Sequence, residues 1–156
     1  MIYELCKVHS LPISIDEAWA FFSTAGNLEK ITPPDLSFHI LTQLKDAPIY
    51  SGMIINYIVR PLFGIPLRWT TEITNVNAPF TFTDRQVKGP YALWEHTHTF
   101  ESVPGGVKMT DVVRYALPLY FLGELAHRMV VKKKLNDIFE YREKTLNNLF
   151  GSMENI

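Results

Sequence analysis

Hydrophobic and polar residues alternate with a period of two near the N-terminus and again along most of the chain from residue 36 to residue 117. Such alternation is typical of β-strands, in which successive side chains point to opposite faces. Proline and glycine separate the later segments by short links, so neighbouring strands are expected to run antiparallel. The pattern predicts strands at residues 2–10, 36–43, 53–60, 67–76, 80–88, 92–102 and 107–117.

Three other segments have a helical period. Residues 14–23 offer Ser14 as an N-cap, followed by an apolar stripe at Ile15, Trp19 and Phe22. The segment "NLEKITPPD" predicts a second short helix, which ends at its two prolines because proline lacks the amide N–H. Residues 122–150 predict one helix of about seven turns. Its stripe comprises Leu122, Leu125, Met129, Leu135, Ile138, Phe139, Arg142, Leu146 and Leu149.

The order of these elements predicts an α+β fold with a single domain over residues 1–156. In β-α-α-β6-α order, a curved antiparallel sheet of about seven strands can wrap around the long C-terminal helix. The helix then buries its apolar stripe on the concave face of the sheet. Such wrapping tends to leave a cavity between the sheet and the helix.

Composition narrows the class of protein. A net charge of -1 gives no electrostatic reason to expect nucleic acid as a partner, and Lys132–Lys134 are expected to form a solvated helix face. Cys6 is the single cysteine, which excludes an internal disulfide and a thiolate zinc motif. No signal-peptide pattern and no apolar run of membrane-spanning length occurs. We therefore expect a cytoplasmic monomer or homodimer without integral membrane association.

The strand "LWEHTHTFES" carries two histidines on the face that should point inward. Its alternation separates an aromatic and imidazole set, Trp94, His96, His98 and Phe100, from a polar set, Glu95, Thr97, Thr99 and Glu101. If "PGG" turns the following hairpin, the inward residues of the two strands face each other. The predicted pairs are Phe100 with Met109, His98 with Asp111, His96 with Val113, and Trp94 with Tyr115.

The same parity gives the rest of the inner wall an aromatic character with scattered polar groups. It places Ile55, Tyr57, Val59, Trp69, Thr71, Ile73, Phe82, Asp84 and Gln86 inward. A largely apolar cavity with a few convergent polar side chains is how small-molecule sites are usually built. The predicted ligand-binding residues are Tyr57, Trp69, Gln86, Trp94, His96, His98, Asp111 and Tyr115.

Two chemical alternatives concern the histidines. His96 and His98 could both reach one metal ion with Asp111 opposite, but the sequence shows no clear set of three strong ligands, so no metal or other cofactor is expected. No serine or cysteine occupies a recognisable nucleophile position, so no catalytic residue is assigned. Acid–base catalysis by the His98 and Asp111 pair remains open.

Four segments resemble ligand-binding SRPBCC proteins of the START and Bet v 1-like superfamily. They are "AWAFFSTAGNLEKITPP", "IPLRWTTEI", "GPYALWEHTHTFE" and "MTDVVRYALP", and the resemblance covers nearly the whole chain. Its most specific parts are the Trp94, His96, His98, Phe100 alternation and the Asp111, Val113, Tyr115 alternation. Both are typical of a bacterial branch often labelled cell division inhibitor-like.

The resemblance implies a helix-grip fold whose cavity serves across the superfamily for lipids, sterols, plant hormones and polyketides. The leading hypothesis is therefore binding of a hydrophobic or aromatic small molecule, such as a lipid or polyketide, by a protein without enzymatic activity. One alternative is a polyketide cyclase, aromatase or dehydratase that uses His98 and Asp111 as an acid–base pair. Another is a regulatory protein-interaction module. Fold alone does not choose between them.

Overall fold

A computed structural model describes residues 1–43, 46–61 and 64–153. Seven strands form one antiparallel sheet in the order β1-β7-β6-β5-β4-β3-β2. The strands are β1 (Tyr3–Leu11), β2 (His39–Ile40), β3 (Ile54–Val59), β4 (Leu67–Asn77), β5 (Thr81–Lys88), β6 (Leu93–Val103) and β7 (Gly106–Ala116). The helical elements are α1 (Ile15–Phe22), α2 (Asn27–Lys30), η1 (Pro34–Leu36), α3 (Tyr120–Ala126), η2 (His127–Val131) and α4 (Lys132–Phe150).

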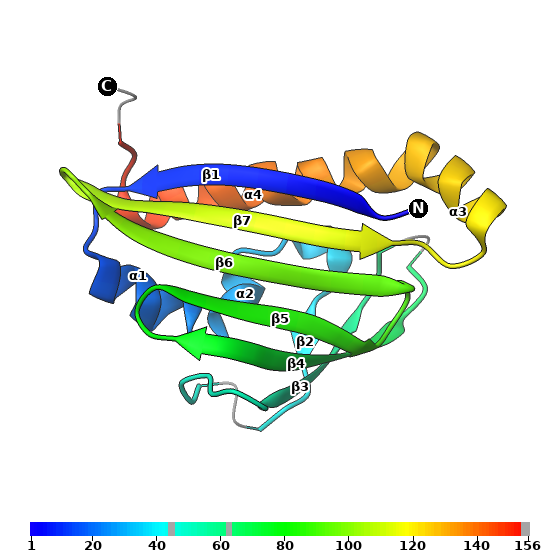
Figure 1. The fold of residues 1–156 in the computed structure, drawn as a ribbon, viewed down its shortest axis with the longest axis horizontal. Coiled ribbons are helices and arrows are strands. Elements are labelled where there is room, and N and C mark those ends of the chain that lie inside the picture. The colour runs from blue at the N-terminus through cyan, green and yellow to red at the C-terminus, as the bar shows by residue number, and fades with distance from the viewer. Residues whose placement is uncertain (44–45, 62–63, 154–156) are drawn as a thin grey trace.

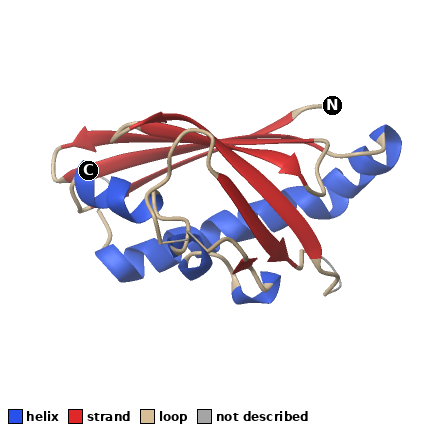
Figure 2. Ribbon diagram, turned by 90° about the horizontal axis from the view of Figure 1, so that it is seen from below, coloured by secondary structure: helices blue, strands red, loops and turns tan. Residues whose placement is uncertain are grey.

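The helices all lie on one side of the sheet. Figure 1 shows α4 running along the sheet behind β1 and β7, and Figure 2 shows the sheet curling over α4 and the short helices. This is the α+β, helix-grip architecture expected from the order of elements and from the resemblance. Burying the apolar face of α4 on a concave sheet requires that curvature.

The predicted start of the first helix is confirmed at the atomic level. Ser14 Oγ accepts a hydrogen bond from the Glu17 backbone N–H at 3.1 Å, and Glu17 Oε2 accepts one from the Ser14 N–H at 3.1 Å. This reciprocal capping box satisfies two amide groups that the first turn would otherwise leave unpaired.

The predicted register of the last hairpin is also confirmed. Strands β6 and β7 pair Phe100 with Met109 and His98 with Asp111, and the other two predicted pairs follow in the same register. The register is well determined because a slip by one residue would turn every inward side chain outward.

The strand predicted at residues 36–43 is largely wrong. Residues 34–36 form the 3₁₀ turn η1, Ser37 has a left-handed backbone with φ of 47°, and only β2 is a regular strand. Proline is tolerated at the start of a helical turn, so Pro34 opens η1 after α2 has already ended. The segment still follows β3, because the Arg60 N–H donates to the Leu36 carbonyl and the Leu41 N–H to the Asn56 carbonyl.

The predicted long C-terminal helix is confirmed, but it does not keep one period along its length. A π-helical turn, η2, separates α3 from α4, and a π turn shifts the phase of a helix so that one 3.6-residue period cannot describe both sides. On α4 the stripe residues Leu135, Phe139 and Leu146 are buried. In α3 and η2, which precede α4, the stripe residues are exposed: Leu122, Leu125 and Met129 are 66%, 57% and 70% exposed. Figure 1 shows why, since α3 extends beyond the ends of the strands.

The solid core lies between the sheet, α1 and the end of α4. Leu11, Ala18 and Val107 are completely buried there. The Trp19 ring meets the rings of Phe82 and Phe100 edge-on, with centroids 5.7 and 5.9 Å apart. This packing closes one end of the space between sheet and helix, so the site must lie toward the other end.

Candidate functional site

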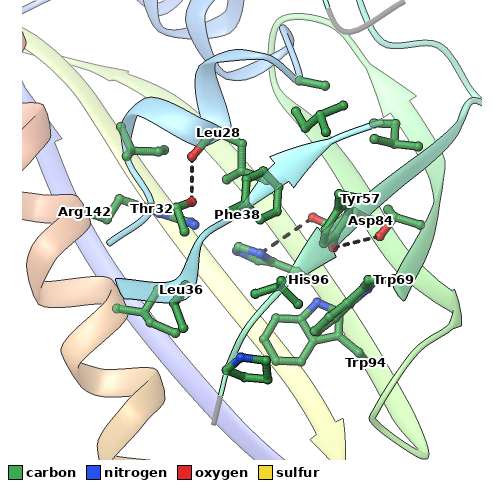
Figure 3. Close-up of a pocket in the computed structure, with 18 of the residues that line it drawn as sticks. Leu28, Thr32, Leu36, Phe38, Tyr57, Trp69, Asp84, Trp94, His96 and Arg142 are labelled. Carbon is green, nitrogen blue, oxygen red and sulfur yellow. Dashed lines mark hydrogen bonds and ion pairs between the residues drawn. The ribbon is translucent and has the colours of Figure 1, made fainter. Parts of the chain in front are cut away.

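A cavity of about 530 Å³ separates the sheet from α4. Its wall comes from the concave faces of β3 to β6, the segment from α1 to β2, and α4, and most of that wall is apolar (Figure 3). The volume falls within the range of typical small-molecule sites.

None of the described helices is long and apolar enough to cross a membrane.

Two histidines and two aspartates form a compact polar cluster on the sheet side of this cavity. Asp84 on β5 stands opposite His96, and Asp111 on β7 stands opposite His98. The shortest hydrogen bonds run diagonally instead: His96 Nε2 to Asp111 Oδ1 is 2.7 Å, and His98 Nε2 to Asp84 Oδ2 is 2.9 Å. Because His98 Nδ1 also lies 3.1 Å from Asp111 Oδ1, both nitrogens of this ring face carboxylates.

The two rings differ in charge. Burial lowers the pKa of His98, but its hydrogen bonds to Asp111 and Asp84 outweigh burial and raise the pKa to about 9. Burial and the neighbouring His98 charge lower the pKa of His96. Although burial alone would raise them, the pKa values of Asp84 and Asp111 are lowered by the two histidines. At pH 7 the cluster therefore holds two carboxylates, one imidazolium and one neutral imidazole.

Arg142 is a site residue that the sequence pattern placed on the apolar stripe of the last helix without predicting a role for it. It projects from α4 into the cavity wall (Figure 3), and its guanidinium carbon lies 4.9 Å from the centre of the Phe139 ring. Burial lowers the pKa of Arg142, opposed by the charges of Asp111 and Asp84, and an arginine stays protonated in proteins. The two cations, His98 and Arg142, thus balance the two carboxylates. The signal was visible in the sequence as a charged residue on the apolar stripe of the last helix.

Aromatic rings form the wall beside the cluster. The Tyr57 and Trp69 rings stack with centroids 5.7 Å apart, and Trp94 meets Trp69 edge-on at 5.3 Å. Tyr91, from the β5–β6 loop, completes this group and was also missed, because loop residues carry no strand parity. Burial raises the pKa of both Tyr57 and Tyr91, so these phenols stay neutral at physiological pH.

Five of the eight predicted ligand-binding residues line the cavity: Tyr57, Trp69, Trp94, His96 and His98. The other three lie outside its lining. The Gln86 side chain exchanges two hydrogen bonds with the backbone of Tyr91, and the Tyr115 hydroxyl lies 2.8 Å from His127 Nε2. Asp111 stands behind the histidines and orients them.

The same cluster contains the atoms that could hold a metal ion. One ligand atom each from Asp84, His96 and His98 lie within 4.8 Å of one another. The metal alternative expected from the sequence used Asp111 as the acidic ligand, whereas the structure brings Asp84 together with the two histidines. Both histidines already hydrogen-bond carboxylates, and an ion would have to displace the proton from His98. The absence of a metal therefore stays a prediction.

Comparison with known proteins establishes the fold. No family model and no curated protein matches the chain. Among solved structures, a START superfamily protein from Mycobacterium smegmatis is similar with a TM-score of 0.68 and 13% identity, covering 94% of this chain and 96% of that one. The structure of Ara h 8.0201 is similar with a TM-score of 0.59 and 16% identity, covering 95% and 99%.

The chain has the START and Bet v 1-like fold. The same fold recurs inside a larger protein: a nucleoside-diphosphate sugar epimerase from Corynebacterium glutamicum is similar with a TM-score of 0.65 and 22% identity. The match covers 92% of this chain but 28% of that one. These likenesses establish the fold alone, so the function has to be argued from the cavity and the residues that line it.

Proposed function

We propose that this protein binds a hydrophobic or aromatic small molecule, such as a lipid or polyketide, in the cavity between the sheet and α4. The observation that carries the proposal is the cavity of about 530 Å³, whose largely apolar wall meets one polar cluster. Burial of apolar surface supplies affinity in such sites, and a few polar groups fix the orientation of the ligand.

The cluster supports binding better than acid–base catalysis. A general acid or base must reach the substrate proton within hydrogen-bond distance. Both nitrogens of His98 face carboxylates, and His96 Nε2 is engaged with Asp111. The cyclase or dehydratase alternative would therefore require the cluster to open. A purely regulatory interaction module gives no reason for a cavity of this size.

The test is to extract the purified protein with organic solvent and identify any co-purified compound by mass spectrometry. Titration with that compound, or with the hydrophobic dye 8-anilinonaphthalene-1-sulfonate, then measures binding. Ile55→Trp should abolish it, because Ile55 is buried and lines the cavity. The matched control is Ile54→Trp on the same strand, where Ile54 is 43% exposed on the opposite face.

Equal binding by the two tryptophan variants would show that the dye or ligand sits elsewhere and would contradict the proposal. Thermal melts of both variants establish that the comparison is made between folded proteins.

A further inference from the structure

Two buried N–H donors of the cavity wall lack an acceptor within residues 1–43, 46–61 and 64–153. They are Trp69 Nε1 on β4 and Arg142 Nε on α4, and both residues line the cavity. Buried polar groups almost always have a hydrogen-bond partner, and an unpaired one costs free energy. Figure 3 shows that these two side chains approach the cavity from different sides.

The side-chain acceptors of the polar cluster and of the neighbouring wall already have partners. Asp84 and Asp111 pair with the histidines, and the Tyr57 hydroxyl lies 3.2 Å from Thr71 Oγ1. Thr32, another residue of the cavity wall, donates its hydroxyl to the Leu28 carbonyl at 2.6 Å (Figure 3). Among the side chains that the structure describes, the unpaired buried atoms are donors and include no acceptor. The wall is therefore complementary to a ligand that supplies acceptors.

The charges of the cluster constrain the ligand further. Two carboxylates face one imidazolium and one guanidinium, so the buried charges already sum to zero. A charged ligand would bring an uncompensated charge into a largely apolar cavity, which is costly. A carbonyl oxygen is neutral and offers two lone pairs to donors.

We propose that the cavity takes a neutral hydrophobic ligand, such as a ketone, ester or quinone, whose carbonyl oxygens accept hydrogen bonds from Trp69 Nε1 and Arg142 Nε. This inference rests on the proposed function and specifies the chemical class of the ligand.

Three probes of one shape separate the contributions: 2,6-diacetylnaphthalene, 2,6-diisopropylnaphthalene and 2,6-naphthalenedicarboxylate. Calorimetric titration of the wild-type protein should show the diketone binding about tenfold more tightly than either of the others, since each donor then gains a partner. Trp69→Phe, which keeps an aromatic ring, and Arg142→Met should each lower this preference about threefold to tenfold. Neither substitution should change the affinity for 2,6-diisopropylnaphthalene as much as it changes the affinity for the diketone.

Trp94→Phe is the matched control, because it makes the same change on another ring of the same wall. It should lower the affinity for all three probes alike and preserve the ratio between them. Since Arg142→Met also removes a buried charge, thermal melts accompany each variant, and Trp69→Phe tests the proposal without any change of charge.

The outcomes are distinguishable. Equal affinity for diketone and hydrocarbon overturns the carbonyl proposal and leaves cavity binding intact, as does a preference that survives both Trp69→Phe and Arg142→Met. Tightest binding of the dicarboxylate overturns the neutral-ligand part. If none of the three binds to the wild type, the proposed function fails together with this inference.

Discussion

Both halves of strand β6 face the interior, but different interactions stabilise them. Toward the β6–β7 turn, Phe100 is 3% exposed and packs against Trp19 and Phe22. Two and four residues earlier on the same face, His98 and His96 meet carboxylates and border a cavity. One half is held by apolar packing and the other by a balanced set of buried charges. The sheet is continuous across both, so the difference arises from what the helices place opposite each half.

The largest expected effect is the loss of packing around Phe100, in the half of β6 that lies toward the β6–β7 turn. Phe100→Ala should lower the free energy of unfolding by about 3–5 kcal/mol, because it removes a buried ring and leaves a cavity in a packed core. Urea denaturation measures it. The contrasting variant, Trp94→Ala, should cost less stability and instead weaken the binding of most ligands, since Trp94 lines the existing cavity. Equal losses of stability in both variants would contradict the comparison.

The second-largest effect on stability is expected in the half of β6 that carries His96 and His98. Asp111→Ala should lower the free energy of unfolding by about 3 kcal/mol, because it leaves His98 and Arg142 with Asp84 as the one remaining carboxylate of the cluster. Its control is Asp137→Ala, which removes an exposed ion pair with Lys133 and should leave the free energy of unfolding almost unchanged. A small effect of Asp111→Ala would show that water screens the cluster.

The pH dependence of stability should separate His98 from the two aspartates of the cluster. His98 has a folded pKa of about 9 against an ordinary value of 6.5, so its contribution is full below pH 6.5 and is lost as the pH rises through 9. That shift corresponds to about 3 kcal/mol. The lowered pKa values of Asp84 and Asp111 act oppositely, and their contribution is lost only as the pH falls below about 4.

His98→Gln should therefore flatten the decline in unfolding free energy between pH 6.5 and 9, measured by urea denaturation at several pH values. His39→Gln makes the same change on an exposed ring and should leave the decline intact. A decline that persists in His98→Gln would assign it to other groups.

The smallest effect on stability is expected in α3, which extends beyond the ends of the strands. Leu125→Ser on α3 should change the free energy of unfolding by no more than about 0.5 kcal/mol, because Leu125 is already 57% exposed. The same substitution at Leu135 of α4, which is 5% exposed, should cost several times more. Circular dichroism melts of the two variants suffice, and similar losses would show that α3 packs against the sheet.

Much of the sheet and half of the site followed from the sequence. Alternation in β6 and β7, with "PGG" between them, determined the pairing of His98 with Asp111, because parity leaves one register that buries the apolar set. The same local logic placed Ser14 at a helix start and predicted five cavity-lining residues. These features depend on the period of the chain and on contacts between neighbouring strands.

The tertiary structure decided what the period could not. The diagonal hydrogen bonds between the histidines and aspartates depend on side-chain geometry across three strands, and they raise the pKa of His98. Burial and the His98 charge lower the pKa of His96. The π turn of η2 removes α3 from the stripe that α4 buries, and only the packed sheet shows where the helix leaves it. Arg142 was visible as an anomaly on that stripe. Its role as counter-charge to Asp84 and Asp111 appears only when α4 lies across the sheet, because charges distant in sequence interact strongly only when folding brings them together away from water.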